Sequence, residues 1–237
     1  MSIQWTPQYY QKMLALNPIA YWVEDEKSGT VAYDLVSGRV AGAQNGTHSG
    51  VTLWQNGIGD GRRAAGYNGQ SSYTNIYSPA FAGAFNGASG TAMIWMRVSG
   101  VGVWTDGAVG GMFVLQVDGN NYVRLRKSNA NNQIQFWYKA GGTFESVVAA
   151  YSALTWTHIA VTWSKAAEEM RAYLNGVQTG VTQVALGVWA GALNASTTVL
   201  GASNDTPAEP FPGYLAHAAV FNRALSPAEI ETLSVVV

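Results

Sequence analysis

Apolar and polar residues alternate with a period of two along several short stretches of the chain. Residues 122–126 (YVRLR) and 133–138 (QIQFWY) direct polar side chains to one side and apolar side chains to the other, the pattern of a half-buried β-strand. Residues 92–96 (AMIWM) and 159–163 (IAVTW) are continuous apolar runs, which are typical of strands buried on both faces. These stretches predict β-strands.

Turn residues separate the predicted strands. Asp118-Gly119-Asn120 predicts a hairpin turn, and so does Asn175-Gly176, because Asn-Gly tolerates the positive φ angles of a type I′ turn. The Gly/Ala/Ser-rich residues 80–90 are expected to form a loop. Short strands joined by turns, without alternating helices, predict an all-β fold: an antiparallel jelly-roll sandwich of two sheets.

Helix signals stand near the two ends of the sequence. Thr6 is expected to cap a helix with Pro7 in its first turn, which ends before Asn17-Pro18. Residues 226–229 (SPAE) form a capping box with proline at the first helical position. We therefore expect a helical extension over residues 1–16, a sandwich domain over residues 17–237, and one short helix at each end.

The apolar faces of the predicted strands must meet in a core. The side chains that we expect to be buried in the sandwich are Trp95, Trp156, Ile159, Val161, Trp163, Leu174 and Phe221.

Composition excludes several classes of function. Lys plus Arg is 13, Asp plus Glu is 14, and charged residues make up 11% of the chain, so no basic excess favours nucleic acid. No apolar run is long enough to cross a membrane, and the absence of cysteine excludes thiolate sites. A neutral surface rich in amides and aromatic rings suits sugars, and with 48% hydrophobic residues it also suits association with itself or a partner.

Six short motifs occur in an order that resembles a known family. They are residues 17–22 (NPIAYW), 65–69 (AGYNG), 156–162 (WTHIAVT), 173–176 (YLNG), 211–215 (FPGYL) and 221–226 (FNRALS). Together they resemble the laminin-G-like, concanavalin-A-like lectin/glucanase superfamily, of the type found in bacterial and phage proteins. The resemblance implies a jelly roll, but not a ligand, because this fold hosts lectins, adhesion modules, glycosidases and lyases.

Two sequence features point toward catalysis, and both are incomplete. Glu24 and Glu26 have the spacing of a glycosidase carboxylate pair, but we interpret residues 24–26 as a solvated turn, since nothing apolar adjoins them to raise a pKa. Residues 138–141 (YKAG) resemble part of an alginate-lyase motif, but its Gln-x-His partner is missing from residues 133–135 (QIQ). We therefore expect no catalytic residues and no enzyme.

The histidines and turn acids bear on cofactors. His48, His158 and His217 are far apart in sequence, and His158 is expected to be a hydrogen-bonded structural histidine. The resemblance implies calcium as a possible cofactor, with turn acids as its ligands, although Ala216-His217 replaces the two acids that relatives often carry there. The candidate calcium ligands are Asp60, Asp106, Asp118 and Asp205.

Three loops carry the candidate ligand-binding residues, because sandwich loops are held by the scaffold while their sequences are free. A tryptophan face stacks on a sugar ring, while Asp and Asn bond its hydroxyls. The alternative is that Trp104 plugs the end of the sandwich and the asparagines make turns. The candidates are Trp104, Asp106, Asn129, Asn131, Asn204 and Asp205.

The expected function is recognition or structure. Residues 1–7 (MSIQWTP) show no secretory signal, so we expect a phage virion surface protein made in the host cytoplasm: a capsid decoration, tail or receptor-binding component. Its partners would be other virion subunits or copies of itself, with a cell-surface glycan as ligand. The alternatives are a secreted or surface lectin and, ranked last, a glycoside hydrolase or polysaccharide lyase.

Overall fold

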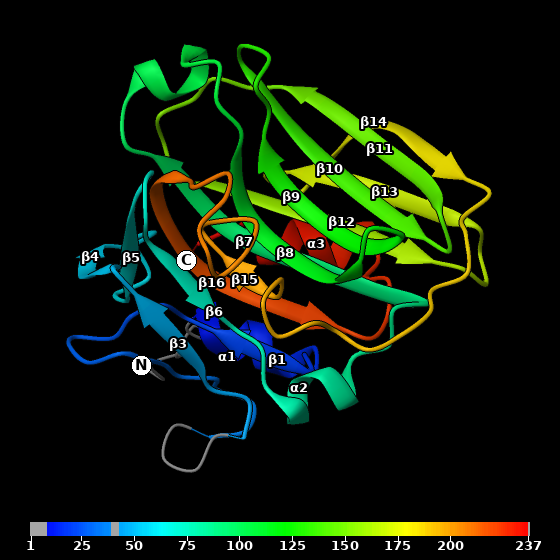
Figure 1. Cartoon of the computed structure of the whole chain (residues 1–237), viewed down its shortest axis with the longest axis horizontal. Coiled ribbons are helices and arrows are strands. Elements are labelled where there is room, and N and C mark those ends of the chain that lie inside the picture. The colour runs from blue at the N-terminus through cyan, green and yellow to red at the C-terminus, as the bar shows by residue number, and fades with distance from the viewer. Residues whose placement is uncertain (1–8, 39–42, 237) are drawn as a thin grey trace, which may run out of the picture.

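The protein is a sandwich of two antiparallel β-sheets. The computed structural model describes residues 9–38 and 43–236. Figure 1 shows the strands β8–β11 nearer the viewer than the helix α3, which lies behind the sandwich. The predicted all-β, two-sheet jelly-roll architecture is confirmed.

The first sheet, called sheet A, is centred on two long strands, β7 and β16. Its strands follow the spatial order β14 (Val177–Val184), β13 (Glu169–Leu174), β12 (Thr157–Ser164), β7 (Ser89–Val98), β16 (Pro212–Phe221), β5 (Arg63–Asn68) and β4 (Thr52–Asn56), and β1 (Ala20–Trp22) also pairs with β16.

The second sheet, called sheet B, packs against one face of sheet A. Its spatial order is β11 (Thr143–Ala150), β10 (Gln133–Ala140), β9 (Asn121–Lys127), β8 (Gly110–Asp118), β15 (Val199–Leu200), β6 (Tyr73–Asn75), β3 (Gly46–Ser49) and β2 (Val31–Ala32). The predicted strands at residues 122–126 and 133–138 lie within β9 and β10, and both predicted hairpin turns are present.

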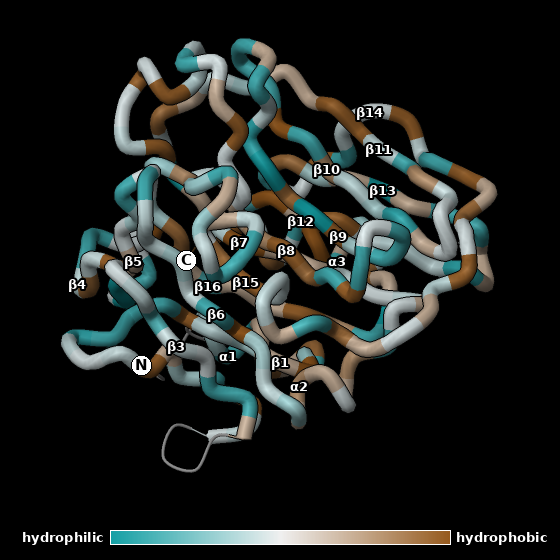
Figure 2. Tube along the Cα trace, viewed as in Figure 1, coloured by the Kyte–Doolittle hydropathy of each residue, from teal (hydrophilic) through white to brown (hydrophobic). Residues whose placement is uncertain are grey.

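The main core lies between the two sheets. Ile94, Ile159 and Val161 from sheet A meet Leu125 and Phe136 from sheet B, all fully buried or nearly so. Figure 2 shows the hydrophobic positions along the central strands β7 and β12. Because side chains alternate along a strand, the neighbouring residues of β7 and β12 point to the other face of sheet A.

That other face carries a second core, covered by the helices α1 (Tyr9–Ala15) and α3 (Pro227–Leu233). Trp95 and Phe221 are buried in this second core. Their predicted burial is confirmed, but we expected them between the two sheets. Trp156 and Leu174 are half-buried, contrary to the prediction of full burial, because both lie at strand ends.

The predicted terminal helices form. Ser226 caps α3 through the expected capping box with Glu229, whereas Thr6 and Pro7 lie outside the described residues. The loop predicted at residues 80–90 is wrong in its first part: α2 (Pro79–Ala84) begins there, because Ser78 accepts the Phe81 N–H and proline follows the cap. A 3₁₀ helix covers Val101–Thr105. No helix in the described part of the chain has the length and apolar character needed to cross a membrane.

Candidate functional site

The outward face of strands β8–β11 gathers aromatic, cationic and amide side chains. Register sets this face: Gln116, Tyr122, Lys139 and Phe144 are cross-strand neighbours in one row. The next rows pair Arg124 with Trp137 and Arg126 with Gln135. We call this surface the β8–β11 face and define it by Gln116, Tyr122, Arg124, Arg126, Gln135, Trp137, Lys139 and Phe144.

Three aromatic rings form the centre of the β8–β11 face. The ring centroids of Trp137 and Phe144 are 5.3 Å apart in an edge-to-face arrangement, and Tyr122 lies 6.3 Å from Trp137. Phe144 is 44% exposed, and the other two rings are half-buried. These contacts fix the rings, so a flat ligand meets them without further ordering.

Cations lie directly on these rings. The Arg126 guanidinium is 3.4 Å from the Trp137 ring centroid, and the Arg124 guanidinium is 4.8 Å from that of Tyr122. Lys139 Nζ approaches Tyr122 at 5.9 Å. Burial lowers the pKa of Arg126 from its ordinary value, but a guanidinium stays charged at neutral pH. Stacked guanidinium groups keep their edge N–H donors available to a planar acceptor.

The β8–β11 face is positively charged. Glu209, on the loop after β15, lies 3.3 Å from Arg126 and 3.9 Å from Arg124. One carboxylate thus faces two guanidinium groups, while Lys139 bonds the carbonyl of Gly119 and interacts with the exposed carboxylate of Asp118. Three cations against two carboxylates leave a net positive charge. An anionic group on a ligand would balance this excess.

The amides of this face are oriented by the arginines. Gln116 Oε1 accepts from Arg124 at 2.6 Å, and Gln135 Oε1 accepts from Arg126 at 2.8 Å. Each amide therefore keeps its NH₂ donors for another partner. The alternation of residues predicts both strands but not the site, because the polar half of a strand pattern indicates only a solvent-facing side.

The structure corrects the role expected for Trp104. The indole is 1% exposed, packs edge-on against Tyr151, and donates its N–H to the Ala153 carbonyl. A buried ring has no free face for a sugar, so Trp104 plugs the end of the sandwich, as the alternative interpretation held. Asp106 beside it is bound to the buried Lys127 at 2.5 Å.

The remaining predicted loop residues divide between exposed and turn-forming positions. Asn129 and Asn131 are exposed. Asn204 Oδ1 accepts the Ala208 N–H, closing a turn, and the Asp205 backbone N–H bonds the Ser196 carbonyl. Their binding role stays a prediction.

The four candidate calcium ligands do not gather into one site. Asp60 lies 3.2 Å from His217 Nε2; burial alone would raise the pKa of Asp60, but His217 lowers it below its ordinary value. Asp118 accepts from the Asn120 N–H and the Asn121 amide, which lower its pKa. Within residues 9–38 and 43–236, no group of three or more His, Asp or Glu side chains is placed to hold a metal ion.

The structure also shows the surroundings of Tyr138, a possible catalytic residue by sequence, and of His158, an expected structural histidine. Tyr138, in the lyase-like motif, is fully buried, stacks on Trp163 and donates to the Gly87 carbonyl. Its hydroxyl therefore faces the core and not a substrate. His158 is buried against Trp95 as expected, but neither ring nitrogen has a hydrogen-bond partner among the described residues, and burial lowers its pKa to about 3.

Glu24, Asp25 and Glu26 do not form the solvated turn that we expected. All three are buried: Glu24 accepts from the Tyr67 hydroxyl at 2.8 Å, and Asp25 pairs with Arg62 at 2.7 Å. Burial raises the pKa of Glu24 to about 7. The prediction failed because it considered sequence neighbours only, whereas the apolar surroundings come from strands distant in sequence.

His48 joins Glu24 and Glu26 into one buried cluster. Its Nε2 is 3.3 Å from Glu26 and its Nδ1 is 3.8 Å from Glu24, and Thr74 Oγ1 lies 2.9 Å from Nδ1. Burial alone would lower the pKa of His48, but the two carboxylates raise it above its ordinary value. Glu24 is fully buried, so this pair cannot reach a glycosidic bond as a catalytic couple.

Comparison with known proteins identifies the fold. The family described as the concanavalin A-like lectin/glucanases superfamily matches residues 68–231. No curated protein sequence matches the chain significantly.

Solved structures from several kinds of protein share this fold. Domain 4 of AbnA, an extracellular arabinanase from Geobacillus stearothermophilus solved with arabinotriose, has 18% identity and a TM-score of 0.63, over 92% of this chain and 98% of that domain. The Trypanosoma rangeli sialidase with sialic acid has 12% identity and a TM-score of 0.64, over 91% of this chain and 32% of the sialidase. The receptor-binding domain of botulinum neurotoxin mosaic serotype C/D has 13% identity and a TM-score of 0.64, over 92% of this chain and 50% of that domain.

Proposed function

The chain belongs to the concanavalin A-like lectin/glucanases superfamily, and from that premise we propose that it is a non-catalytic carbohydrate-binding domain. The β8–β11 face carries this proposal: three fixed rings, three cations and two oriented amides lie on four adjacent strands. Sugar rings stack on aromatic faces, and their hydroxyls bond amide and guanidinium groups.

The charge of this face favours an acidic glycan, such as a chain of uronic acids. The three cations of this face outnumber the two carboxylates near them: Glu209 lies beside Arg124 and Arg126. The second carboxylate, that of Asp118, interacts with Lys139. A guanidinium binds a carboxylate through two parallel N–H donors, which adds geometric selectivity to charge. Neutral chains would use the same rings without this ion pairing.

The surroundings of the carboxylates favour a binding role over cleavage, because neighbouring side chains already engage them. Glycoside hydrolysis uses two carboxyl groups about 5–10 Å apart beside the substrate. Glu209 is held by the two arginines, and Glu24 and Glu26 are buried beside His48. These arrangements leave no acid–base pair on the β8–β11 face.

The test is affinity electrophoresis of the purified protein in gels that contain a polyuronate or a neutral glucan. We expect the polyuronate to retard the wild type, and Arg124→Ala to weaken that binding about tenfold or more, as loss of a charged hydrogen bond implies. Arg171→Ala is the matched control, since Arg171 lies on β13 of the other sheet, paired with Glu169.

Three further results would decide against the proposal. Equal binding by Arg124→Ala and the wild type would move the site elsewhere. Retardation by neither polymer would remove these glycan classes as ligands. Release of reducing ends or unsaturated products during incubation would show that the domain is an enzyme.

A further inference from the structure

Glu209 places an acidic side chain of this chain itself against the two arginines of the β8–β11 face. It belongs to residues 201–211, the loop that joins β15, a neighbour of β8, to β16 (Figure 1). Its side chain is 30% exposed. A carboxylate is the group that pairs best with a guanidinium, so Glu209 occupies the position that the acid group of a ligand would take.

The contacts between the Glu209 carboxylate and the arginines are loose. One carboxylate oxygen accepts from Arg126 at 3.3 Å, and the other lies 3.9 Å from Arg124, which is too long for a hydrogen bond. The buried Nε of Arg124 has no hydrogen-bond partner among the described residues. Neither arginine thus receives the two parallel bonds of a strong pair, and partly exposed ion pairs contribute little to stability. A ligand with better geometry can therefore displace this carboxylate.

The loop does not depend on the Glu209 side chain for its shape. Backbone hydrogen bonds close it: the Ser203 N–H bonds the Ala208 carbonyl at 2.8 Å. Nearer the start of β16, the Phe211 N–H bonds the Gly201 carbonyl at 2.9 Å. Apart from the arginines, the Ser203 hydroxyl is the group that bonds the Glu209 carboxylate among the described residues. Release of the carboxylate therefore needs the rotation of one side chain, while the backbone of the loop stays in place.

The backbone of Glu209 has a conformation that few residues adopt. Its φ angle is +50°, in the left-handed region that is uncommon for residues other than glycine. Such conformations persist where the surrounding structure imposes them, and they cluster at functional sites. Here the Glu209 carbonyl accepts the Gly111 N–H at 2.8 Å, which ties the residue to β8, next to the strand β9 that carries both arginines. The loop thus keeps the carboxylate beside them.

We propose that Glu209 is an internal competitor: it occupies the oxyanion subsite of the β8–β11 face and leaves Arg124 and Arg126 when an anionic ligand binds. The inference rests on the proposed function and adds to it a residue that sets selectivity. A neutral chain has no oxyanion to replace the Glu209 carboxylate, so only an anionic ligand gains the two arginines.

The experiment compares Glu209→Gln with the wild type by ¹⁹F NMR of protein labelled with 5-fluorotryptophan. The Arg126 guanidinium lies on the Trp137 ring, so the Trp137 resonance, assigned with Trp137→Phe, reports on the subsite. Both proteins are titrated with the polyuronate and, separately, with inorganic sulfate. We expect the variant to bind each anion about fivefold more tightly, the upper value for the loss of one exposed ion pair.

Asp118→Asn is the matched control for charge. It removes the other carboxylate near this face, which interacts with Lys139, and asparagine keeps an acceptor for the Asn120 N–H. This variant should change either affinity by less than about twofold, because the charge it removes is exposed and screened. Glu209→Gly also removes the competing carboxylate and suits the left-handed backbone. It should bind as Glu209→Gln does, and it takes the place of that variant if Glu209→Gln fails to fold.

The direction of the change in affinity separates this inference from the proposed function. Weaker or unchanged binding of both anions by Glu209→Gln would mean that Glu209 positions the arginines or is idle, and would overturn the inference. Equal tightening by Asp118→Asn would overturn it too, because any lost charge would then have the same effect. If the polyuronate binds neither protein but sulfate binds Glu209→Gln more tightly, the proposed function fails for this polymer and the competitor stands. If neither anion binds either protein, both proposals are overturned.

Discussion

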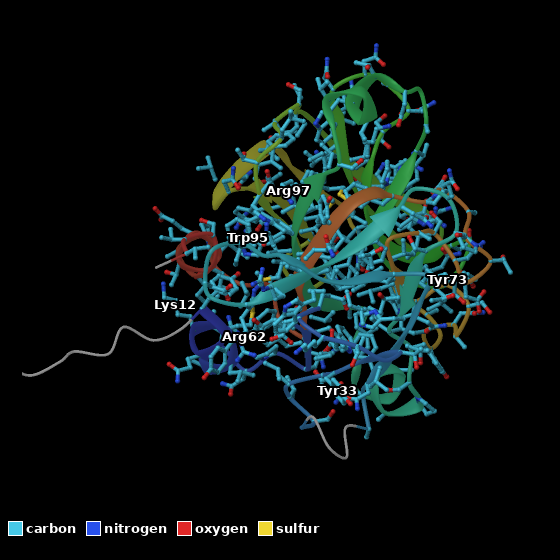
Figure 3. The ribbon with its side chains drawn as sticks, turned by 90° about the vertical axis from the view of Figure 1, so that its left-hand side faces the viewer. Lys12, Tyr33, Arg62, Tyr73, Trp95 and Arg97 are labelled. Atoms are coloured by element: carbon cyan, nitrogen blue, oxygen red, sulfur yellow. The ribbon has the colours of Figure 1, made fainter. Side chains whose placement is uncertain are left out.

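The outward faces of the two sheets carry similar aromatic side chains, but these are covered by helices on sheet A and stay partly exposed on sheet B. On sheet A, Trp95, Tyr173 and Phe221 are covered by α1 and α3 and form a second core. On sheet B, Tyr122 and Trp137 stay partly open, and arginines lie on their rings. Figure 3 shows Trp95 beside α3, on the covered side.

This difference separates structural aromatics from candidate binding aromatics. A ring covered by a helix contributes buried area and finds its polar partner inside: Trp95 donates its indole N–H to the Tyr9 hydroxyl, which donates to the Leu233 carbonyl. A ring covered only by a charged side chain at the surface contributes less buried area to stability, and a ligand can reach the part of the ring that stays exposed. Mutations of the covered rings on sheet A should therefore lower the stability of the fold, whereas mutations on the β8–β11 face should weaken ligand binding.

The largest effect is expected from truncation of the covered ring. Trp95→Ala should lower the free energy of unfolding by about 3–5 kcal/mol, since it leaves a cavity under the helices. Trp137→Ala should cost less than about 2 kcal/mol, because its ring is half-exposed. Urea denaturation of both variants measures this, and equal losses would erase the distinction between the two faces.

A second prediction concerns the buried acid between the sheets. The folded chain keeps the Glu24 proton up to about pH 7, whereas the unfolded chain releases it near the ordinary value of 4.5. The contribution of Glu24 to stability should therefore fall as pH rises from about 4.5 to 7, and stay lost above 7. Glu24→Gln cannot ionise but still accepts from Tyr67.

Comparison of Glu24→Gln with the wild type across pH isolates this contribution. The two proteins should be similar near pH 5, and the variant should gain up to about 3 kcal/mol above pH 7, at about 1.4 kcal/mol per pKa unit. His48 and Glu26 face the same carboxyl, so the gain is shared with them. His158 titrates in both proteins and cancels. Parallel stability curves would show that Glu24 does not titrate in this range.

The smallest effect concerns the strain at Trp54. In an ordinary strand Gly is less stable than Ala, but at φ +62° glycine meets no steric penalty. Trp54→Gly should therefore be more stable than Trp54→Ala by about 1 kcal/mol. Thermal melts show which of the two variants is more stable. A higher melting temperature for Trp54→Ala would mean that the backbone is not strained at this position.

Sequence patterns predicted the secondary-structure elements better than the tertiary contacts around individual side chains. Alternation in β9 and β10, the capping box at Ser226 and the Asn175-Gly176 turn are local signals, because each depends on residues a few positions apart. The burial of Glu24 depends on Tyr67 and Thr74, from strands β5 and β6. No local pattern records such contacts.

The candidate site shows the same limit. Trp104 was a candidate because it lies in a glycine-rich segment, but tertiary packing buries its ring at the end of the sandwich. The residues of the β8–β11 face were visible as the polar half of two strands, but their meeting with Glu209 and Phe144 needs the register of the sheet. The virion location, self-association and the binding roles of Asn129 and Asn131 stay predictions.

The packing of α1 against α3 also determines how the domain can be displayed. Both helices cover sheet A, and Tyr9 bonds directly to Leu233 across them, so the first and last described residues, Tyr9 and Val236, lie on the helix-covered face of sheet A. A bead, a fluorophore or a neighbouring domain attached to that side of the molecule would leave the β8–β11 face directed outward. Copies tethered side by side in this orientation would present an array of parallel platforms, in which many weak contacts with one polymer add up to durable attachment.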